Sequence, residues 1–173
     1  MRWPRSDRSL FDMLLNKFSR LAIVAGLVVA ADQISKALIL KNLPLHHSIP
    51  VIAGLFDITH ILNPGGAFGF MADMSSVVRT VVFLFISSMA VGLIFYFYHK
   101  TPPDQTLLAT GFALIFGGAI GNLIDRVRFG TVVDFLDFYI GRHHWPAFNI
   151  ADSAITVGIF IFIYHLVFKK MPE

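Results

Sequence analysis

Four long apolar stretches constrain the fold of this chain more than any other feature of its sequence. They cover residues 21–40, 77–98, 107–124 and 150–168. Each is close to the roughly 20 residues that a helix needs to cross the hydrocarbon core of a bilayer. Open strands cannot cross lipid, because their backbone polar groups would lack hydrogen-bond partners. The sequence therefore predicts four transmembrane helices.

The composition agrees with an integral membrane protein, which we treat as a single domain over residues 1–173. Hydrophobic residues make up 55% of the chain and charged residues only 14%, whereas about a quarter of a soluble domain is charged. The chain has no cysteine, which excludes disulfides and thiolate nucleophiles. Its basic residues do not form an aromatic-interleaved patch, so nucleic-acid binding has little support.

The distribution of lysine and arginine predicts the orientation of these helices. Four spans place both termini on one side of the membrane. The terminal segments and the short connection 101–105 with its flanks are richer in basic residues than the longer connections 41–76 and 125–149. The positive-inside rule then predicts that both termini, including segment 1–20, are cytoplasmic, and that 41–76 and 125–149 are extracytoplasmic.

The N-terminal region has two further interpretations. Basic residues followed by an apolar run and Val29-Ala30-Ala31 resemble a cleavable signal peptide. The apolar pattern resumes through Leu40, however, which favours a retained first helix. Residues 9–20 also have the pattern of an amphipathic helix that lies along the inner membrane surface.

The first outer segment predicts a small extracytoplasmic sheet. Residues 49–62 are rich in β-branched side chains that partly alternate with polar ones, as is typical of strands. Asn63-Pro64-Gly65-Gly66 then predicts a turn. The predicted fold class is an all-α membrane protein with four transmembrane helices and a small extracytoplasmic β-sheet.

Two aspartates at the ends of apolar spans are candidates for catalysis. Asp134 follows the third span in Val-Val-Asp-Phe, and Asp152 opens the fourth. Placing an ionisable group at the edge of a bilayer costs free energy, so such groups usually have a function. One ionised and one protonated carboxyl suffice to activate water and protonate a carbonyl oxygen. The alternatives are that Asn149 and Asp152 only cap a helix, and that Asp134 and Asp137 are interfacial surface acids.

A second polar group lies at the outer end of the third span. Asn122, Asp125 and Arg126 have the spacing of one helical face,. They form either a helix-end salt bridge with a snorkelling arginine, or a group that orients a catalytic carboxylate or holds a lipid headgroup. Asp125 also competes with Asp134 as the partner of Asp152.

The first and third spans also carry features of helix packing. Asp32 and Lys36 are four residues apart, which predicts an intramembrane ion pair that holds helices together. A lipid headgroup contact is the alternative. Gly117, Gly118 and Gly121 form a small-residue face that permits close approach of another helix.

The sequence shows no pattern of a metal or nucleotide site. His46-His47 and His143-His144 are adjacent pairs, and adjacent side chains do not share a helical face. No P-loop, Gly-x-Gly-x-x-Gly or Gly-x-Ser-x-Gly motif occurs,. We therefore expect no metal and no cofactor.

Five short motifs resemble those of bacterial lipoprotein signal peptidase, also called signal peptidase II. In chain order they are Ala-Asp-Gln-Ile-Ser-Lys (31–36), Asn-Pro-Gly-Gly-Ala-Phe-Gly (63–69), Gly-Gly-Ala-Ile-Gly-Asn-Leu-Ile-Asp-Arg (117–126), Val-Val-Asp-Phe (132–135) and Phe-Asn-Ile-Ala-Asp-Ser (148–153). The match departs from the family in the second glycine of the 63–69 motif and in a longer N-terminal extension.

The resemblance implies an aspartic endopeptidase of the bacterial cytoplasmic (inner) membrane. Such an enzyme removes the signal peptide from diacylglyceryl-modified prolipoproteins by cutting just before the lipidated cysteine. The catalytic dyad of the family falls on Asp134 and Asp152, which favours Asp134 over Asp125. The family's supporting polar residues fall on Asn63, Asn122, Arg126, Asn149, Asp32 and Lys36. The implied fold adds an outer β-cradle, and the expected partners are prolipoproteins and membrane phospholipid, with the enzyme a monomer.

Two other functions compete with the peptidase. A proton-coupled transporter would use the same carboxylates, but it needs acidic groups near the bilayer midplane and interrupted helices. A non-enzymatic assembly or lipid-binding protein explains the glycine face but leaves Asp134 and Asp152 without a role.

Overall fold

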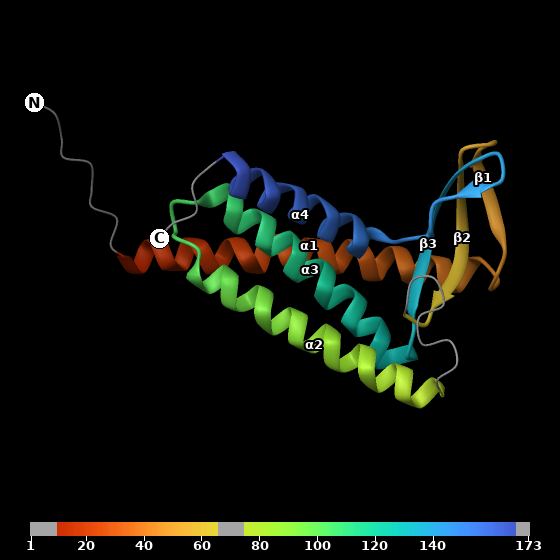
Figure 1. Ribbon diagram of the computed structural model, residues 1–173, viewed down its shortest axis with the longest axis horizontal. Coiled ribbons are helices and arrows are strands. Elements are labelled where there is room, and N and C mark those ends of the chain that lie inside the picture. Colours follow the sequence, from red (N-terminus) through yellow and green to blue (C-terminus); the bar gives the residue numbers. More distant parts are fainter. Residues whose placement is uncertain (1–9, 66–74, 169–173) are drawn as a thin grey trace, which may run out of the picture.

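The computed structural model describes the backbone of residues 10–65 and 75–168 and the side chains from residue 17 onward (Figure 1). Its elements are α1 (Leu10–Asn42), β1 (Ser48–Ile52), β2 (Phe56–Asn63), α2 (Ser76–Lys100), α3 (Thr106–Phe129), β3 (Val132–Ile140), β4 (His143–His144) and α4 (Ile150–Phe168). Within this described part of the chain, four helices are long and apolar enough to cross a membrane. The prediction of four membrane helices joined to a small sheet is therefore confirmed.

Two of the predicted boundaries differ from the structure. Residues 10–20 belong to the continuous helix α1 and do not form a separate surface helix. Helix α3 continues to Phe129, five residues beyond the predicted end of the third span. The segment predicted to connect the third and fourth spans, residues 125–149, therefore begins inside α3. Asp125 does not end this helix, because its side chain is buried against a partner.

Helix α3 is the centre of the bundle and packs against α1, α2 and α4. Figure 1 shows α3 between α2 and α4. A Cβ on Gly117 would lie 2.8 Å from the Cα of Ala25 in α1, and one on Gly118 would lie 2.7 Å from Cγ1 of Ile155 in α4. The predicted role of these glycines in close helix packing is confirmed.

The strands form one antiparallel sheet in the order β1-β2-β3-β4. It lies where α1 ends and α4 begins, opposite the start of α1 and the end of α4 (Figure 1). The sheet predicted in residues 41–76 is confirmed by β1 and β2, and the later connection adds β3 and β4. The predicted turn follows β2 with Pro64 and Gly65, whose φ is +87°, while Gly66 lies outside the described residues.

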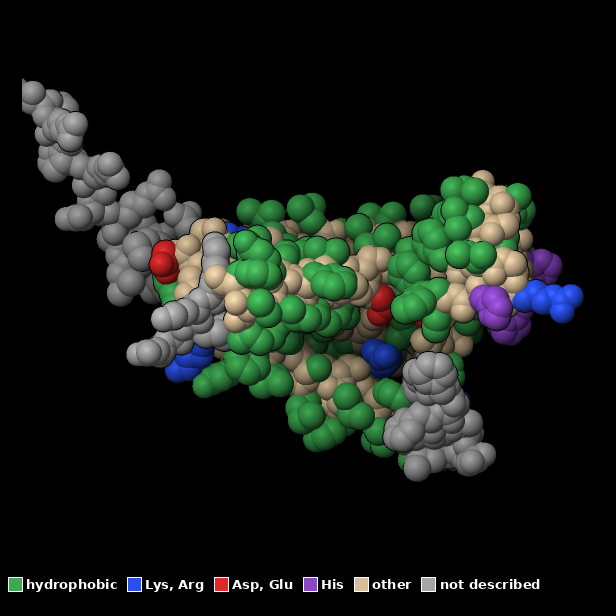
Figure 2. Space-filling model, turned by 45° about the horizontal axis from the view of Figure 1, so that its top comes forward, with side chains coloured by type: hydrophobic (Ala, Val, Ile, Leu, Met, Phe, Trp, Pro, Cys, Tyr) green, Lys and Arg blue, Asp and Glu red, His purple; other side chains and the backbone are tan. Residues whose placement is uncertain are grey.

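Figure 2 shows hydrophobic side chains over most of the helical body, with histidine side chains gathered at the far end of the sheet. Large apolar residues are exposed along the helices, among them Leu27, Phe85 and Phe160, each more than 60% accessible. A surface of this kind is expected where lipid takes the place of water. The chain is a multi-pass membrane protein.

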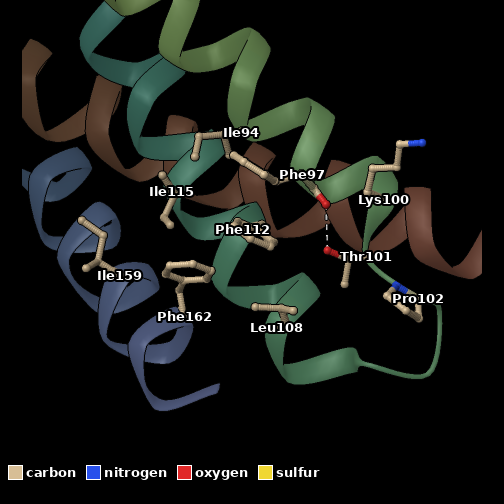
Figure 3. A pocket seen from close by; sticks show the side chains of 10 residues that line it. All are labelled: Ile94, Phe97, Lys100, Thr101, Pro102, Leu108, Phe112, Ile115, Ile159 and Phe162. Atoms are coloured by element: carbon tan, nitrogen blue, oxygen red, sulfur yellow. Dashed lines mark hydrogen bonds between the residues drawn. The ribbon is translucent and has the colours of Figure 1, made fainter. Parts of the chain in front are cut away.

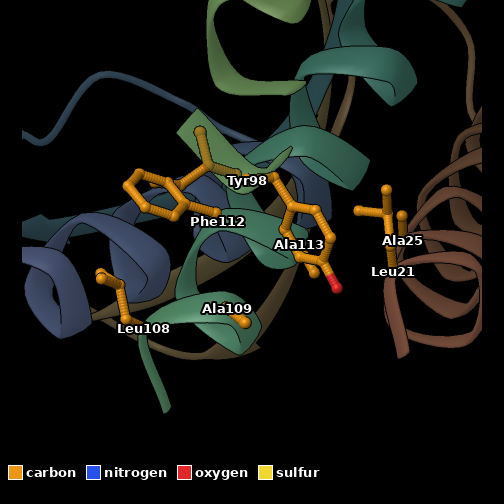
Figure 4. Packing of buried hydrophobic residues seen from close by; sticks show 8 residues of the cluster. Leu21, Ala25, Tyr98, Leu108, Ala109, Phe112 and Ala113 are labelled. Carbon is orange, nitrogen blue, oxygen red and sulfur yellow. The ribbon is translucent and has the colours of Figure 1, made fainter. Parts of the chain in front are cut away.

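At the end remote from the sheet, α1 is fastened to the end of α2. The amine of Lys17 donates hydrogen bonds to the carbonyls of His99 and Thr101, which satisfies the carbonyls left free at a helix C-terminus. The hydroxyl of Tyr98 donates to the carbonyl of Lys17. Figure 4 shows Tyr98 among the buried side chains of Ala25, Ala113 and their neighbours, so this contact also closes the apolar core.

We predict that Gly158→Ala destabilises the bundle by about 1–3 kcal/mol, the usual cost of overpacking. A Cβ there would lie 2.5 Å from both Cγ1 of Ile115 and the carbonyl oxygen of Gly111. The measurement is the free energy of unfolding in mixed detergent micelles.

Gly92→Ala is the matched control, because a Cβ at Gly92 has no atom within 4 Å and alanine favours a helix. Equal stability of the Gly158→Ala and Gly92→Ala proteins would contradict the close packing of α3 on α4.

Candidate active site

Asp134 is placed by the turn that links α3 to β3. Gly130 ends α3 with a φ of +72° and donates its N–H to the carbonyl of Arg126, as a left-handed C-terminal residue does. The chain then enters β3, where Asp134 pairs with Ile61 of β2. The diagonal neighbour Asn63 donates its amide to Oδ2 of Asp134 at 2.9 Å,.

Asn149 contacts both candidate carboxylates. Its side-chain nitrogen donates to Oδ1 of Asp134 at 2.7 Å. Its side-chain oxygen accepts the N–H of Asp152 at 2.9 Å, and its own N–H donates to Oδ2 of Asp152 at 3.3 Å. This reciprocal arrangement is a capping box. The capping interpretation is confirmed, and the same residue joins Asp152 to Asp134.

Asn122 orients Asp152 from the side of α3. Its side-chain nitrogen donates to Oδ1 of Asp152 at 2.8 Å. Its oxygen accepts hydrogen bonds from the amine of Lys36 at 3.0 Å and from the side chain of Asn149 at 3.2 Å. Because both donors approach the oxygen, the NH₂ group of Asn122 must face Asp152. All three of these supporting residues are buried.

Lys36 is buried between two carboxylates. Its amine lies 2.8 Å from Oδ2 of Asp32 and 2.9 Å from Oδ2 of Asp125, and each of these three side chains is at most 2% exposed. The predicted Asp32–Lys36 pair is confirmed. Of the roles considered for Asp125, the structure shows an ion pair, but the partner is Lys36 of α1 and not the adjacent Arg126.

The two acids also hold backbone groups of other elements. Oδ1 of Asp32 accepts the N–H of Ala151 in the first turn of α4 at 3.0 Å. Oδ2 of Asp125 accepts the N–H of Val133 in β3 at 3.1 Å. Each contact lies one residue from a candidate catalytic aspartate. The ion group therefore fixes the backbone on which Asp134 and Asp152 stand.

Gln33 belongs to the same cluster, although it was not among the residues predicted from the sequence. Its side-chain nitrogen donates to Oδ1 of Asp125 at 2.9 Å, and it also lies 3.1 Å from Oδ2 of Asp32 and 3.2 Å from the carbonyl of Gly121. The sequence did contain a signal for Gln33, because it is a second polar residue directly beside Asp32 in a largely apolar span.

The surroundings of Asp134 change its acidity. The pKa of its carboxyl is raised from 3.8 to about 7, mainly because the buried charged form loses solvation. The neighbouring Asp152 carboxylate contributes to this rise, whereas the hydrogen bonds from Asn63 and Asn149 and the charge of Lys36 oppose it. Near neutral pH, Asp134 is thus available in its protonated form.

The remaining charged candidates have distinct surroundings. Arg126 interacts electrostatically with Asp152, Asp134 and Asp125, and its guanidinium lies 5.9 Å from the ring centre of Phe83 in α2. Asp137 lies farther along β3 and pairs with the exposed His144 at 2.9 Å. Neither acid of β3 is fully exposed: the side chain of Asp137 is 13% exposed and that of Asp134 is buried, at 2%.

Metal-binding side chains do not cluster in the described part of the chain. Over residues 17–65 and 75–168, whose side chains are described, no group of three or more histidine, aspartate or glutamate side chains is arranged to hold a metal ion. The acids of the site are instead engaged by the lysine amine, by the amides of asparagine and glutamine, and by backbone N–H groups.

We predict that Lys36→Met lowers the free energy of unfolding by about 3–5 kcal/mol, because it leaves two buried carboxylates without their cation. The measurement is unfolding in mixed micelles. Lys41→Met is the control, since Lys41 lies in the last turn of the same helix and is exposed. A loss of stability no larger than that of the control would contradict the role assigned to Lys36.

Comparisons with known proteins extend over nearly the whole chain. A family model described as signal peptidase (SPase) II matches residues 24–168. The lipoprotein signal peptidase of Desulforapulum autotrophicum is 55% identical over 154 residues, which cover 89% of this chain and 95% of the relative. That of Geobacter sulfurreducens is 53% identical over 138 residues, which cover 80% and 84% of the two chains.

Solved structures agree with these relatives. Two structures described as bacterial membrane enzymes superpose on this chain with TM-scores of 0.77 and 0.74. They are 32% and 33% identical to it and cover 87% and 88% of its length, matching 94% and 93% of their own. The chain belongs to the signal peptidase II family of membrane peptidases.

Proposed function

We propose that this protein is an aspartic endopeptidase that removes the signal peptide from diacylglyceryl-modified prolipoproteins, cutting just before the lipidated cysteine. The observation that carries the proposal is the pair Asp134 and Asp152, two buried or half-buried carboxyls that share Asn149 as a hydrogen-bond partner. The relatives named above are peptidases, so they lend no support to a proton-coupled transporter.

The proposed reaction divides acid and base roles between the two aspartates. Asp152 accepts a proton from a water molecule, whose oxygen attacks the scissile carbonyl carbon. Asp134, whose pKa is raised to about 7, gives its proton to the carbonyl oxygen and so forms a neutral tetrahedral diol. Asp152 then protonates the leaving amide nitrogen. Asp134 takes back the hydroxyl proton as the C–N bond breaks, and both carboxyls regain their starting states.

The two carboxyls accept hydrogen bonds from different groups. Asp152 accepts a backbone N–H at the first turn of α4 and the amide of Asn122, contacts that suit a carboxylate at a helix N-terminus. Asn63 and Asn149 hold the two oxygens of Asp134. Arg126 attracts both aspartates and balances the negative charge that the pair carries.

The proposed orientation follows from charge and from the place of the site. We place both termini in the cytoplasm and the sheet end, with Asp134 and Asp152, at the extracytoplasmic face of the bacterial inner membrane. A diacylglyceryl group on the substrate would then remain in the outer leaflet while the scissile bond meets the dyad. We propose that the enzyme acts as a monomer, because one chain supplies all of these contacts.

The decisive experiment is cleavage of a diacylated prolipoprotein by the detergent-purified protein. Asp134→Asn and Asp152→Asn each remove a proton carrier, so we expect cleavage to fall by at least about 10³-fold, below detection in most assays.

Asp137→Asn, the same change three residues along β3, is the matched control and should retain activity. Normal turnover by either dyad variant, with normal folding, would rule out the assignment. Strong inhibition by a chelator would point to a metal instead.

The raised pKa of Asp134 predicts the alkaline limb of the pH profile. Asp134 holds its proton below about pH 7, so we expect kcat/KM to decrease about tenfold per pH unit well above that value. Measurements of kcat/KM between pH 6 and 9 test this expectation. A constant kcat/KM up to pH 9 would show that Asp134 is not the proton donor.

A further inference from the structure

An apolar groove lies between α2, α3 and α4 at the end of the bundle remote from the dyad. Its volume is about 580 Å³, within the range of roughly 300–1,000 Å³ typical of ligand pockets. Figure 3 shows the side chains that line it, which come from α2, α3, α4 and the connection between α2 and α3. They include Ile94, Phe97, Phe112, Ile115, Ile159 and Phe162.

The groove exists because α2 and α4 both pack on α3 and make few contacts with each other. Three phenyl rings form its wall. The ring centres of Phe97 and Phe112 are 6.1 Å apart, and those of Phe112 and Phe162 are 5.6 Å apart. Water is unfavourable against such a lining, whereas a hydrocarbon chain of the bilayer matches it.

One basic residue stands at the end of this groove. Lys100 closes α2, and its amine points away from the apolar side chains (Figure 3). The amine lies 5.7 Å from the ring centre of Tyr96 and has no ion pair among the described residues. The nearby hydroxyl of Thr101 already donates to the carbonyl of Phe97. Among the residues that the structure describes, Lys100 therefore offers a positive charge without an ion-pair partner at the mouth of an apolar groove.

The groove is separate from the peptidase site. Phe112, in the middle of the groove, and Asn122, in the site, are ten residues apart on α3. At 1.5 Å per residue this is about 15 Å along the helix. None of the residues that line the groove contacts Asp134 or Asp152 through a hydrogen bond.

We propose that this groove binds one anionic phospholipid, with an acyl chain along the phenyl wall and the phosphate at the amine of Lys100. In the orientation proposed above, the Lys100 end faces the cytoplasm, where anionic lipids attract basic residues and basic pockets between membrane helices bind acidic headgroups. The site goes beyond the peptidase function, because it requires neither the dyad nor a prolipoprotein.

The signal peptide of a substrate fits the groove less well than a lipid. A signal peptide begins with basic residues, which the charge of Lys100 repels at the cytoplasmic end. Its apolar part is a helix about 10–12 Å wide, which is broad for a groove of about 580 Å³. A single acyl chain has the right width, and its phosphate has the complementary charge.

The test is native mass spectrometry of the full-length protein in detergent with added phosphatidylglycerol or phosphatidylcholine of identical acyl chains. We expect one phosphatidylglycerol to be retained in preference to phosphatidylcholine. Lys100→Gln should reduce this preference about fivefold, the effect of one lysine on an anionic lipid. Lys41→Gln, which removes an exposed lysine at the opposite end of the bundle, should leave it unchanged.

A second pair of variants tests the groove itself. Ile159→Trp fills the groove and should reduce retention of both lipids several-fold, whereas Ile163→Trp places the same side chain one turn along α4 outside the lining and should have no effect. Retention of phosphatidylglycerol by the Lys100→Gln or the Ile159→Trp protein equal to that of the unaltered protein, or displacement of the lipid by a synthetic signal peptide, would overturn the proposal. Cleavage is assayed separately, so failure of lipid binding is distinguishable from failure of the dyad.

Discussion

The amine of Lys36, buried between Asp32 and Asp125, is the interaction on which the rest of the structure depends. A lone charge at this depth would be very costly, and three charges are tolerated only when they compensate one another and use their remaining hydrogen-bonding capacity. Here they do both, since Asp32 holds the backbone of α4 at Ala151 and Asp125 holds that of β3 at Val133. One ion group thus ties three helices to the sheet.

The same compensation leaves Asp134 free to hold a proton. A single lysine next to a buried carboxyl would strongly stabilise its ionised form. Lys36 instead directs its amine to two other acids and reaches the site through the oxygen of Asn122. Its influence on the pKa of Asp134 is smaller than that of burial, and the pKa settles at about 7. Lys36 therefore orients the residues of the site without removing the proton from Asp134.

Local spacing predicted the parts of the site that lie within a few residues of each other. The four spans, the cap formed by Asn149 and Asp152, and the i, i+4 ion pair of α1 follow from such patterns. Contacts between distant segments did not follow from them. Asn63 meets Asp134 only because β2 and β3 pair across a separation of 71 residues. The partner of Asp125 was misassigned to its neighbour, because spacing along a helix does not reveal which other helix packs there.

Helix α2 takes the smallest part in this network. All of its residues are described, and only Tyr98 is buried. Its firm attachment is at the end remote from the sheet, where Lys17 and Tyr98 join it to α1. On its other side, the groove separates it from α4 over the turns around Phe97. Association of membrane helices depends on packing, so an acyl chain in that groove supplies the contacts that α2 and α4 do not make directly. A bound lipid therefore completes the bundle on the side where the protein alone leaves it open.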